Sequence, residues 1–133
     1  MQEEPFVITA HQTERVLEVM YPARPTLRAY ERYDAECRAA ILQFEQLGTW
    51  HCLVDQSKVV AAMAPDLPPR ISDLIAWSRP RRLGRVARVL SASELGRLQS
   101  RRILRAAGLD GAQLFEDRAA AWAYVVGASN DDS

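Results

Sequence analysis

The fold is decided by residues 85–126, which read RVARVLSASELGRLQSRRILRAAGLDGAQLFEDRAAAWAYVV. Two short apolar runs in this stretch, 86–90 and 112–115, are typical of buried strands. Each run is followed by a helical segment, the first ending at Gly108 and the second at Gly127. A strand, a helix and a further strand are joined by a crossover that places the two strands parallel in one sheet. The sequence therefore predicts an α/β fold.

The first part of the chain supplies the remaining elements. Two β-like runs, 5–10 and 15–21, flank a four-residue polar gap whose length suits an antiparallel hairpin. Thr26 then opens a helix with an apolar stripe that reaches Leu47, and residues 50–55 form a continuously apolar strand. We expect a mixed five-stranded sheet, with an N-terminal antiparallel hairpin followed by parallel βα units, and about four helices.

The segment between the third and fourth strands is less regular. Residues 56–69 combine an apolar run at 59–64 with three prolines, which oppose regular structure. A short amphipathic helix at 71–78 follows, and a connection at 79–85 leads to the next strand. Because long loops in compact domains are functional or mobile, this loop is a candidate for a functional role.

Length and composition are those of one globular domain. The chain has 133 residues, of which 48% are hydrophobic and 26% charged, close to globular averages. We expect one domain over residues 1–127 and a flexible tail at 128–133. No apolar run is long enough to cross a membrane and the first residues are acidic, so we expect a cytoplasmic protein. Cys37 and Cys52 lack metal-ligand or C-x-x-C spacing, and we expect them to be free thiols.

Arginines are concentrated in the second half of the chain, although the net charge is zero. Nucleic-acid binders usually combine an overall basic charge with stacking aromatic residues or a recognition helix. A solvated charged face therefore explains the cluster from Arg79 to Arg88 better than contact with nucleic acid does. On the helix after 86–90, the spacing predicts four arginines in water, with Leu95 and Ile103 facing the core.

Residues near the C-terminus carry a family resemblance. Phe115-Glu116-Asp117 followed by Ala121-Trp122 resembles the closing strand, acidic cap and alanine-tryptophan pair of the STAS domain, the fold of bacterial anti-sigma-factor antagonists. The order of elements over residues 5–127 is similar to the divergent, SpoIIAA-like branch of that family. The resemblance implies a regulatory module that acts by protein contact. Since STAS-like folds are similar to the lipid-binding SEC14 class, it also implies an alternative, a module that binds a small molecule or lipid.

One departure from the family bears on regulation. Phosphorylated antagonists carry an Asp-Ser-Ser/Thr-Gly-like sequence at the start of the helix after the third strand. Here the region reads PPRISD at 68–73, with no glycine and no paired hydroxyls. We therefore expect a STAS-like module without the usual phosphoserine switch.

The sequence does not predict catalysis. His11 in the hairpin turn and His51 in a strand have no partner at useful spacing, and we expect His51 to be a partly buried strand residue. No glycine-rich phosphate-binding motif and no G-x-S-x-G motif occurs. We expect no enzymatic activity, no cofactor and no metal site.

The candidate binding face lies at the carboxyl ends of the parallel strands, where open α/β sheets usually place function. We expect the loop and Trp77 to contact another protein or a second copy in a homodimer, or the loop to cover a ligand pocket. Ser91, which forms a capping box with Glu94, and Ser93 are placed to bind an anion or simply to cap a helix. The candidate residues are Asp55, Ser57, Val59, Val60, Met63, Ser72, Trp77, Ser91 and Ser93.

Overall fold

The computed structural model describes residues 4–108 and 113–131. Ala112, which was expected to begin a strand, and residues 132–133 of the predicted tail lie outside the described residues. The elements are β1 (Val7–His11), β2 (Val16–Met20), α1 (Leu27–Leu47), β3 (Trp50–Asp55), α2 (Leu67–Ser78), β4 (Leu83–Val89), α3 (Glu94–Ala106), β5 (Gln113–Phe115) and α4 (Arg118–Asp131).

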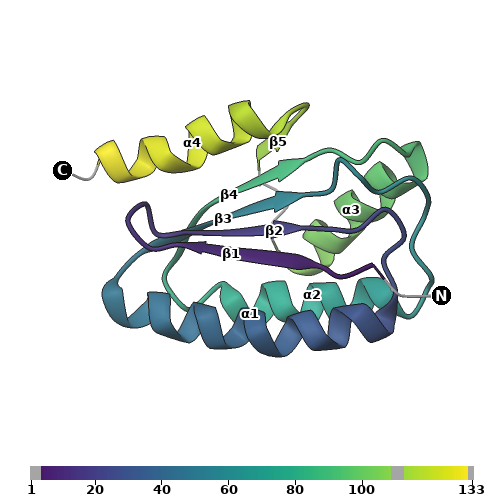
Figure 1. Cartoon of the computed structure of the whole chain (residues 1–133), viewed down its shortest axis with the longest axis horizontal. Helices are drawn as coiled ribbons and strands as arrows, with labels where there is room; N and C mark the ends of the chain where they lie inside the picture. Colours follow the sequence, from purple (N-terminus) through teal and green to yellow (C-terminus); the bar gives the residue numbers. More distant parts are fainter. Residues whose placement is uncertain (1–3, 109–112, 132–133) are drawn as a thin grey trace.

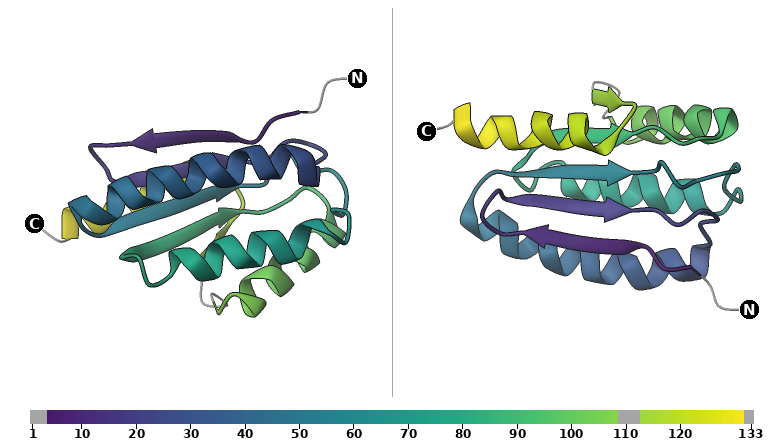
Figure 2. Two further views of the ribbon diagram at one scale, coloured as in Figure 1. Left: turned by 90° about the horizontal axis from the view of Figure 1, so that it is seen from below. Right: turned by 45° about the horizontal axis from the view of Figure 1, so that its top comes forward.

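All five strands form one sheet in the order β1-β2-β3-β4-β5. β1 pairs antiparallel with β2, and the other three pairs of neighbours are parallel. Helices α1 and α2 lie side by side on one face, α4 lies on the other, and α3 packs beside α2 (Figures 1 and 2). The predicted α/β class, with a mixed sheet and four helices, is confirmed.

Helix α1 has the predicted bounds because both of its ends are capped. The Thr26 side chain accepts a hydrogen bond from the backbone N–H of Ala29 at 3.2 Å. Gly48 ends the helix with a φ of 135°, a conformation that favours glycine. The buried face of the helix packs against the sheet and consists of Ala29, Tyr30, Tyr33, Cys37, Ile41 and Phe44.

Helix α2 begins at Leu67, four residues before the predicted start. Pro68 and Pro69 stand in its first turn, where a backbone N–H has no acceptor within the helix in any case. The expectation that these two prolines oppose regular structure was therefore wrong. Of the three prolines, only Pro65 lies in the loop.

Two other elements are longer than predicted. β4 begins at Leu83 because Leu83 pairs with Trp50, beyond an irregularity in the β3–β4 register. α4 continues through Gly127 to Asp131. A single glycine inside a helix costs about 1 kcal/mol relative to alanine, which is too little to end the helix by itself.

The start and the face of α3 also differ from expectation. Its N-cap is Ser93, whose hydroxyl accepts from the N–H of Gly96 at 3.2 Å, and not Ser91. Ile103 is buried as predicted, whereas Leu95 is 63% exposed. The buried face consists of Gly96, Ser100, Ile103 and Leu104, while Arg101, Arg102 and Arg105 are exposed as expected.

The sheet separates two apolar cores. The larger core lies between the sheet and helices α1 and α2, and the smaller one lies beneath α4. Alternate residues of β2, β3 and β4 face opposite cores. On β4, Ala87 and Val89 belong to the core beneath α4, whereas Val86 and Arg88 face the larger core. β4, which lies between β3 and β5 in the sheet, therefore directs the charged side chain of Arg88 into the larger core.

Candidate functional site

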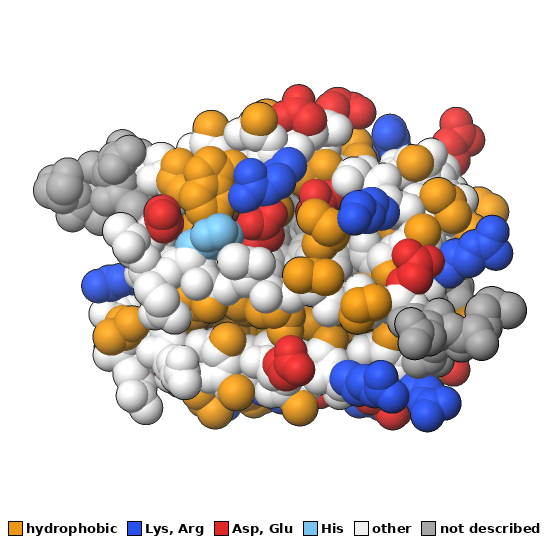
Figure 3. Space-filling model, viewed as in Figure 1, with side chains coloured by type: hydrophobic (Ala, Val, Ile, Leu, Met, Phe, Trp, Pro, Cys, Tyr) orange, Lys and Arg blue, Asp and Glu red, His pale blue; other side chains and the backbone are white. Residues whose placement is uncertain are grey.

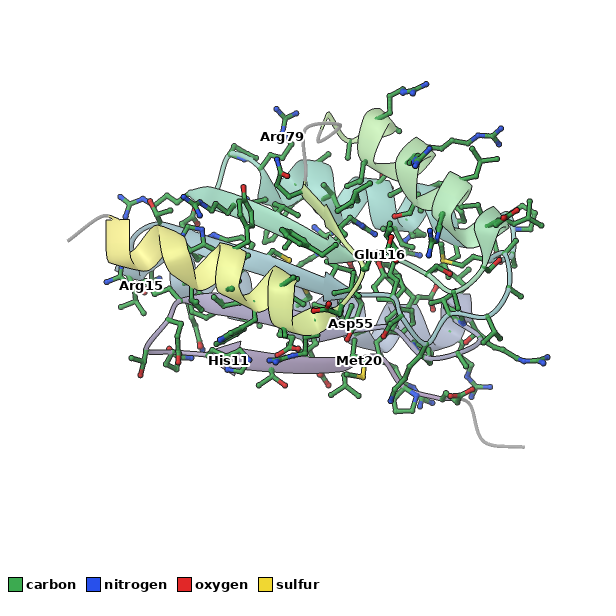
Figure 4. The ribbon with its side chains drawn as sticks, turned by 90° about the horizontal axis from the view of Figure 1, so that it is seen from above. His11, Arg15, Met20, Asp55, Arg79 and Glu116 are labelled. Carbon is green, nitrogen blue, oxygen red and sulfur yellow. The ribbon has the colours of Figure 1, made fainter. Side chains whose placement is uncertain are left out.

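The loop between β3 and α2 is anchored to the body of the domain. Asp55, at the carboxyl end of β3 (Figure 4), is buried and accepts a hydrogen bond from the N–H of Ser57 at 2.9 Å. The buried hydroxyl of Ser91 donates to the carbonyl of Val59 at 2.9 Å and accepts from the N–H of Ser93 at 3.0 Å. Asp55 and Ser91 therefore shape the loops and do not present free polar groups.

The apolar side chains of this loop point mostly into the core. Val59 and Met63 are 2% and 6% exposed, whereas Val60 is 53% exposed. The Gln99 side chain clasps the loop, accepting from the N–H of Met63 at 2.7 Å and donating to its carbonyl at 2.9 Å. The expectation of a contact face is thus wrong for Val59 and Met63, because both fill the end of the larger core.

Ser72 and Trp77 on α2 have partners within the domain. The Ser72 hydroxyl donates to the carbonyl of Ile103 at 3.4 Å. Trp77 is partly exposed as predicted, but the guanidinium groups of Arg38 and Arg81 lie 4.8 Å and 4.0 Å from the centre of its ring. Both residues therefore tie α2 to its neighbours.

The start of α3 is an ordinary N-cap. The N–H of Gly96 bonds to Ser93, and the N–H of Ser93 bonds to Ser91, so neither amide is available to an anion. Arg97 adds a hydrogen bond from Nε to the carbonyl of Ser91 at 2.8 Å. The plain capping role is thus confirmed, with Ser93 as the capping residue.

A polar cluster that the sequence did not reveal lies on the sheet face beside α4. Glu18 is only 8% exposed, and Arg118 donates through Nε and Nη2 to its two oxygens at 2.5 and 2.8 Å. His11 Nε2 lies 2.9 Å from Glu18 Oε1, and the His11 ring meets Trp122 edge to face at 4.7 Å. Figure 3 shows a histidine among acidic and basic side chains between β1 and α4. The expectation that His11 lies in the hairpin turn with no partner at useful spacing was wrong, because His11 ends β1 and Glu18 is its partner. His51 is buried in β3 and accepts from the N–H of Arg85 at 2.8 Å.

This cluster makes stability depend on pH. Hydrogen bonds from Arg118 are the main cause that lowers the pKa of Glu18, and burial opposes them. A carboxyl group with a lowered pKa stabilises the fold above its ordinary value of 4.5 and loses that contribution as pH falls through the folded value. We expect thermal unfolding, followed by circular dichroism, to show a fall in stability below pH 4.5. The fall should be smaller in Glu18→Gln, and equal slopes in the two proteins would contradict the assignment.

A cavity of about 50 Å³ lies between the sheet and helices α1 and α2. Among the described residues that line it, Arg88 is the only charged one. Its walls are otherwise mainly aromatic and aliphatic and include Tyr21, Tyr30, Tyr33, Trp50, Cys52, Ile71 and Leu74.

Arg88 has no counterion within the described chain. It is 1% exposed, and no described residue accepts a hydrogen bond from its Nε or Nη2. A guanidinium group stays charged in proteins, so a full positive charge lies in the core. Burial raises the pKa of Tyr21 and of the Cys52 thiol to about 12 each, and the nearby charge of Arg88 opposes both shifts. Both groups are therefore neutral near pH 7 and do not balance Arg88.

The expectation of a solvated arginine face holds for Arg79 and Arg82, which are exposed, but it is wrong for Arg88. The sequence did contain a signal. Arg88 lies between apolar residues on a predicted buried strand, two positions after Val86, so it shares the face of Val86.

No family model, no curated protein and no solved structure matches this chain. Within residues 4–108 and 113–131, no group of three or more histidine, cysteine, aspartate or glutamate side chains is placed to hold a metal ion. No helix in this part of the chain is both long and apolar enough to cross a membrane. The cavity that Arg88 lines is therefore the candidate site on its geometry alone.

Proposed function

We propose that the domain is a non-enzymatic binding module that holds a small molecule in the cavity between the sheet and helices α1 and α2. The observation that carries this proposal is the buried guanidinium of Arg88, whose Nε and Nη2 find no acceptor among the described residues. Removing an ion from water costs several kcal/mol unless a partner compensates for it. A ligand that accepts hydrogen bonds from Nε and Nη2 offsets that cost.

The position of Arg88 supports the proposal. It is the second-last residue of β4 and so lies near the carboxyl ends of the parallel strands, where α/β sheets usually bind ligands. The SpoIIAA-like resemblance, through its similarity to the lipid-binding SEC14 class, agrees with an apolar pocket.

The thiols of Cys37 and Cys52 line the cavity, but burial raises their pKa values to about 11 and about 12. Because the thiolate is the reactive form, these values favour binding without catalysis.

Native mass spectrometry of the purified protein tests this function. We expect a co-purified small molecule on the wild-type protein and its loss from Arg88→Met. Arg82→Met is the matched control, because Arg82 is exposed and does not line the cavity, and it should keep the molecule. A ligand-free mass in repeated preparations of the wild-type protein would contradict the proposal.

A second candidate function is protein contact, as the resemblance implies for a STAS-like regulatory module. Val60, Leu95 and Leu98 favour it, because they are 53%, 63% and 46% exposed. The Met63–Gln99 clasp holds the loop that carries Val60 against α3, which carries both leucines. The partner we propose is a second copy of the chain. Sedimentation should show a dimer for the wild-type protein and a monomer for Leu95→Glu, and monomers in both would contradict it.

We also propose a cytoplasmic location, which is supported by two cysteines that form no disulfide. Nucleic-acid binding is the least supported alternative, since the net charge is zero and Arg88 is buried. If nucleic acid were the partner, affinity would fall steeply with salt concentration.

A further inference from the structure

We infer that the ligand of this cavity is a short-chain monocarboxylate, whose two oxygens accept hydrogen bonds from Nε and Nη2 of Arg88. The inference rests on the proposed function and names the chemical class of its ligand. It follows from the geometry of the free donors, the charges around them and the size of the cavity.

The two donors without acceptors form one edge of the guanidinium group. Nε–H and one N–H of Nη2 point in parallel from the same side of the planar group. Their spacing matches that of the two oxygens of a carboxylate, which they bind in a bidentate manner. In Arg88 these two nitrogens are the ones that find no acceptor in the described chain.

The same protein shows this pairing elsewhere. Arg118 uses its Nε and Nη2 to bind the two oxygens of the Glu18 carboxylate, at 2.5 and 2.8 Å. The Arg118 side chain is 44% exposed, so water also solvates its charge. Arg88 is 1% exposed and depends more strongly on a partner. The geometry points to a carboxylate at Arg88 that takes the place Glu18 has at Arg118.

The charge of the cavity favours a single negative charge. None of the described residues that line the cavity carries a carboxylate, and the nearby Tyr21 and Cys52 are neutral near pH 7. A monoanion neutralises Arg88. A phosphate dianion would leave one uncompensated charge among apolar side chains, which is costly.

The size of the cavity limits the length of the ligand. At 10–15 Å³ for each water-sized site, about 50 Å³ corresponds to about three to five such sites. Acetate and propionate have four and five non-hydrogen atoms, which agree with this number, and butyrate has six. The side chains of Ile71, Leu74 and Tyr33 supply an apolar wall for their methyl and methylene groups.

The first test titrates the full chain with carboxylates from acetate to octanoate, using calorimetry and ¹H–¹⁵N spectra. We expect saturable binding, with the highest affinity among the two- to four-carbon acids and at least a tenfold loss at octanoate. Propionamide is the neutral control for propionate, and it should bind at least tenfold more weakly. The Nε–H signal of Arg88 should shift with propionate. Equal affinity for propionate and propionamide would overturn the inference.

The second test uses variants whose fold is checked by circular dichroism. Arg88→Lys keeps a positive charge but loses the parallel donors, so propionate affinity should fall at least tenfold. Arg82→Lys is the matched control and should bind like the wild-type protein. Unchanged affinity in Arg88→Lys would overturn the inference. If the Arg88 variants do not fold, the comparison of propionate with propionamide on the wild-type protein still tests whether the cavity binds a carboxylate.

The outcomes separate this inference from the proposed function. If inorganic phosphate or a co-purified neutral molecule binds in an Arg88-dependent way and no carboxylate does, the ligand class is overturned but the cavity remains a binding site. If no carboxylate or phosphate binds and the purified protein is ligand-free, both proposals fail.

Discussion

We expect Arg88→Met to unfold at a higher temperature than the wild-type protein when both are free of ligand. Methionine is of similar length, carries no charge and suits an apolar cavity, so it removes the cost of a buried guanidinium whose Nε and Nη2 have no acceptor among the described residues. Replacing buried ionic groups by well-packed apolar residues often stabilises a protein by about 1–4 kcal/mol. For a domain of this size we expect an increase on the order of 5–10 °C in the melting temperature.

Arg118→Met is the matched control and should shift the melting temperature in the opposite direction. Arg118 holds the nearly buried carboxylate of Glu18, which would lose its bidentate partner. Scanning calorimetry of extensively dialysed proteins measures both changes. A lower melting temperature for ligand-free Arg88→Met would mean that the chain itself compensates the charge of Arg88.

Trp50→Ala should produce the largest loss of stability among the changes discussed. Trp50 is 1% exposed and stacks on Phe44 with ring centres 6.2 Å apart. Its indole N–H donates to the carbonyl of Arg81 at 2.7 Å. Truncating a buried tryptophan to alanine costs about 3–5 kcal/mol, which urea denaturation followed by circular dichroism resolves.

Trp50→Phe separates packing from hydrogen bonding. Phenylalanine keeps an aromatic ring against Phe44 but leaves the carbonyl of Arg81 without its donor, which costs about 1–3 kcal/mol. We therefore expect an intermediate midpoint. If the two variants had equal midpoints, the hydrogen bond and not the packing would account for the loss.

The elements that the sequence predicted well are those whose signals are local. Helix α1 begins after Thr26 and ends before Gly48, as predicted, because helix capping is decided within a few residues. The apolar run at 50–55 forms β3 as expected, since an interior strand is buried on both faces. The ends of helices were predicted wrongly where a proline or glycine is compatible with more than one position relative to a helix. Pro68 and Pro69 start α2, and Gly127 lies within α4.

The candidate site was harder to predict because it depends on what faces each residue across the fold. Val59 and Met63 were expected to be accessible, yet the clasp by Gln99, 36 positions from Met63, turns the loop inward. Glu18 and Arg118 are 100 positions apart, so no local pattern connects them. Arg88 is a partial exception, because the alternation of side chains along β4 places it on the same face as Val86, toward the larger core.

The strand order has a consequence for biosynthesis. Because each strand pairs with the one made just before it, the sheet can be extended from one edge as the ribosome releases the chain. β1 to β3 and α1 are complete by Asp55, and Arg88 emerges later on β4. If the sheet is extended in this order, the guanidinium is withdrawn from solvent only when β4 docks on the three strands made before it, so its desolvation comes late in assembly.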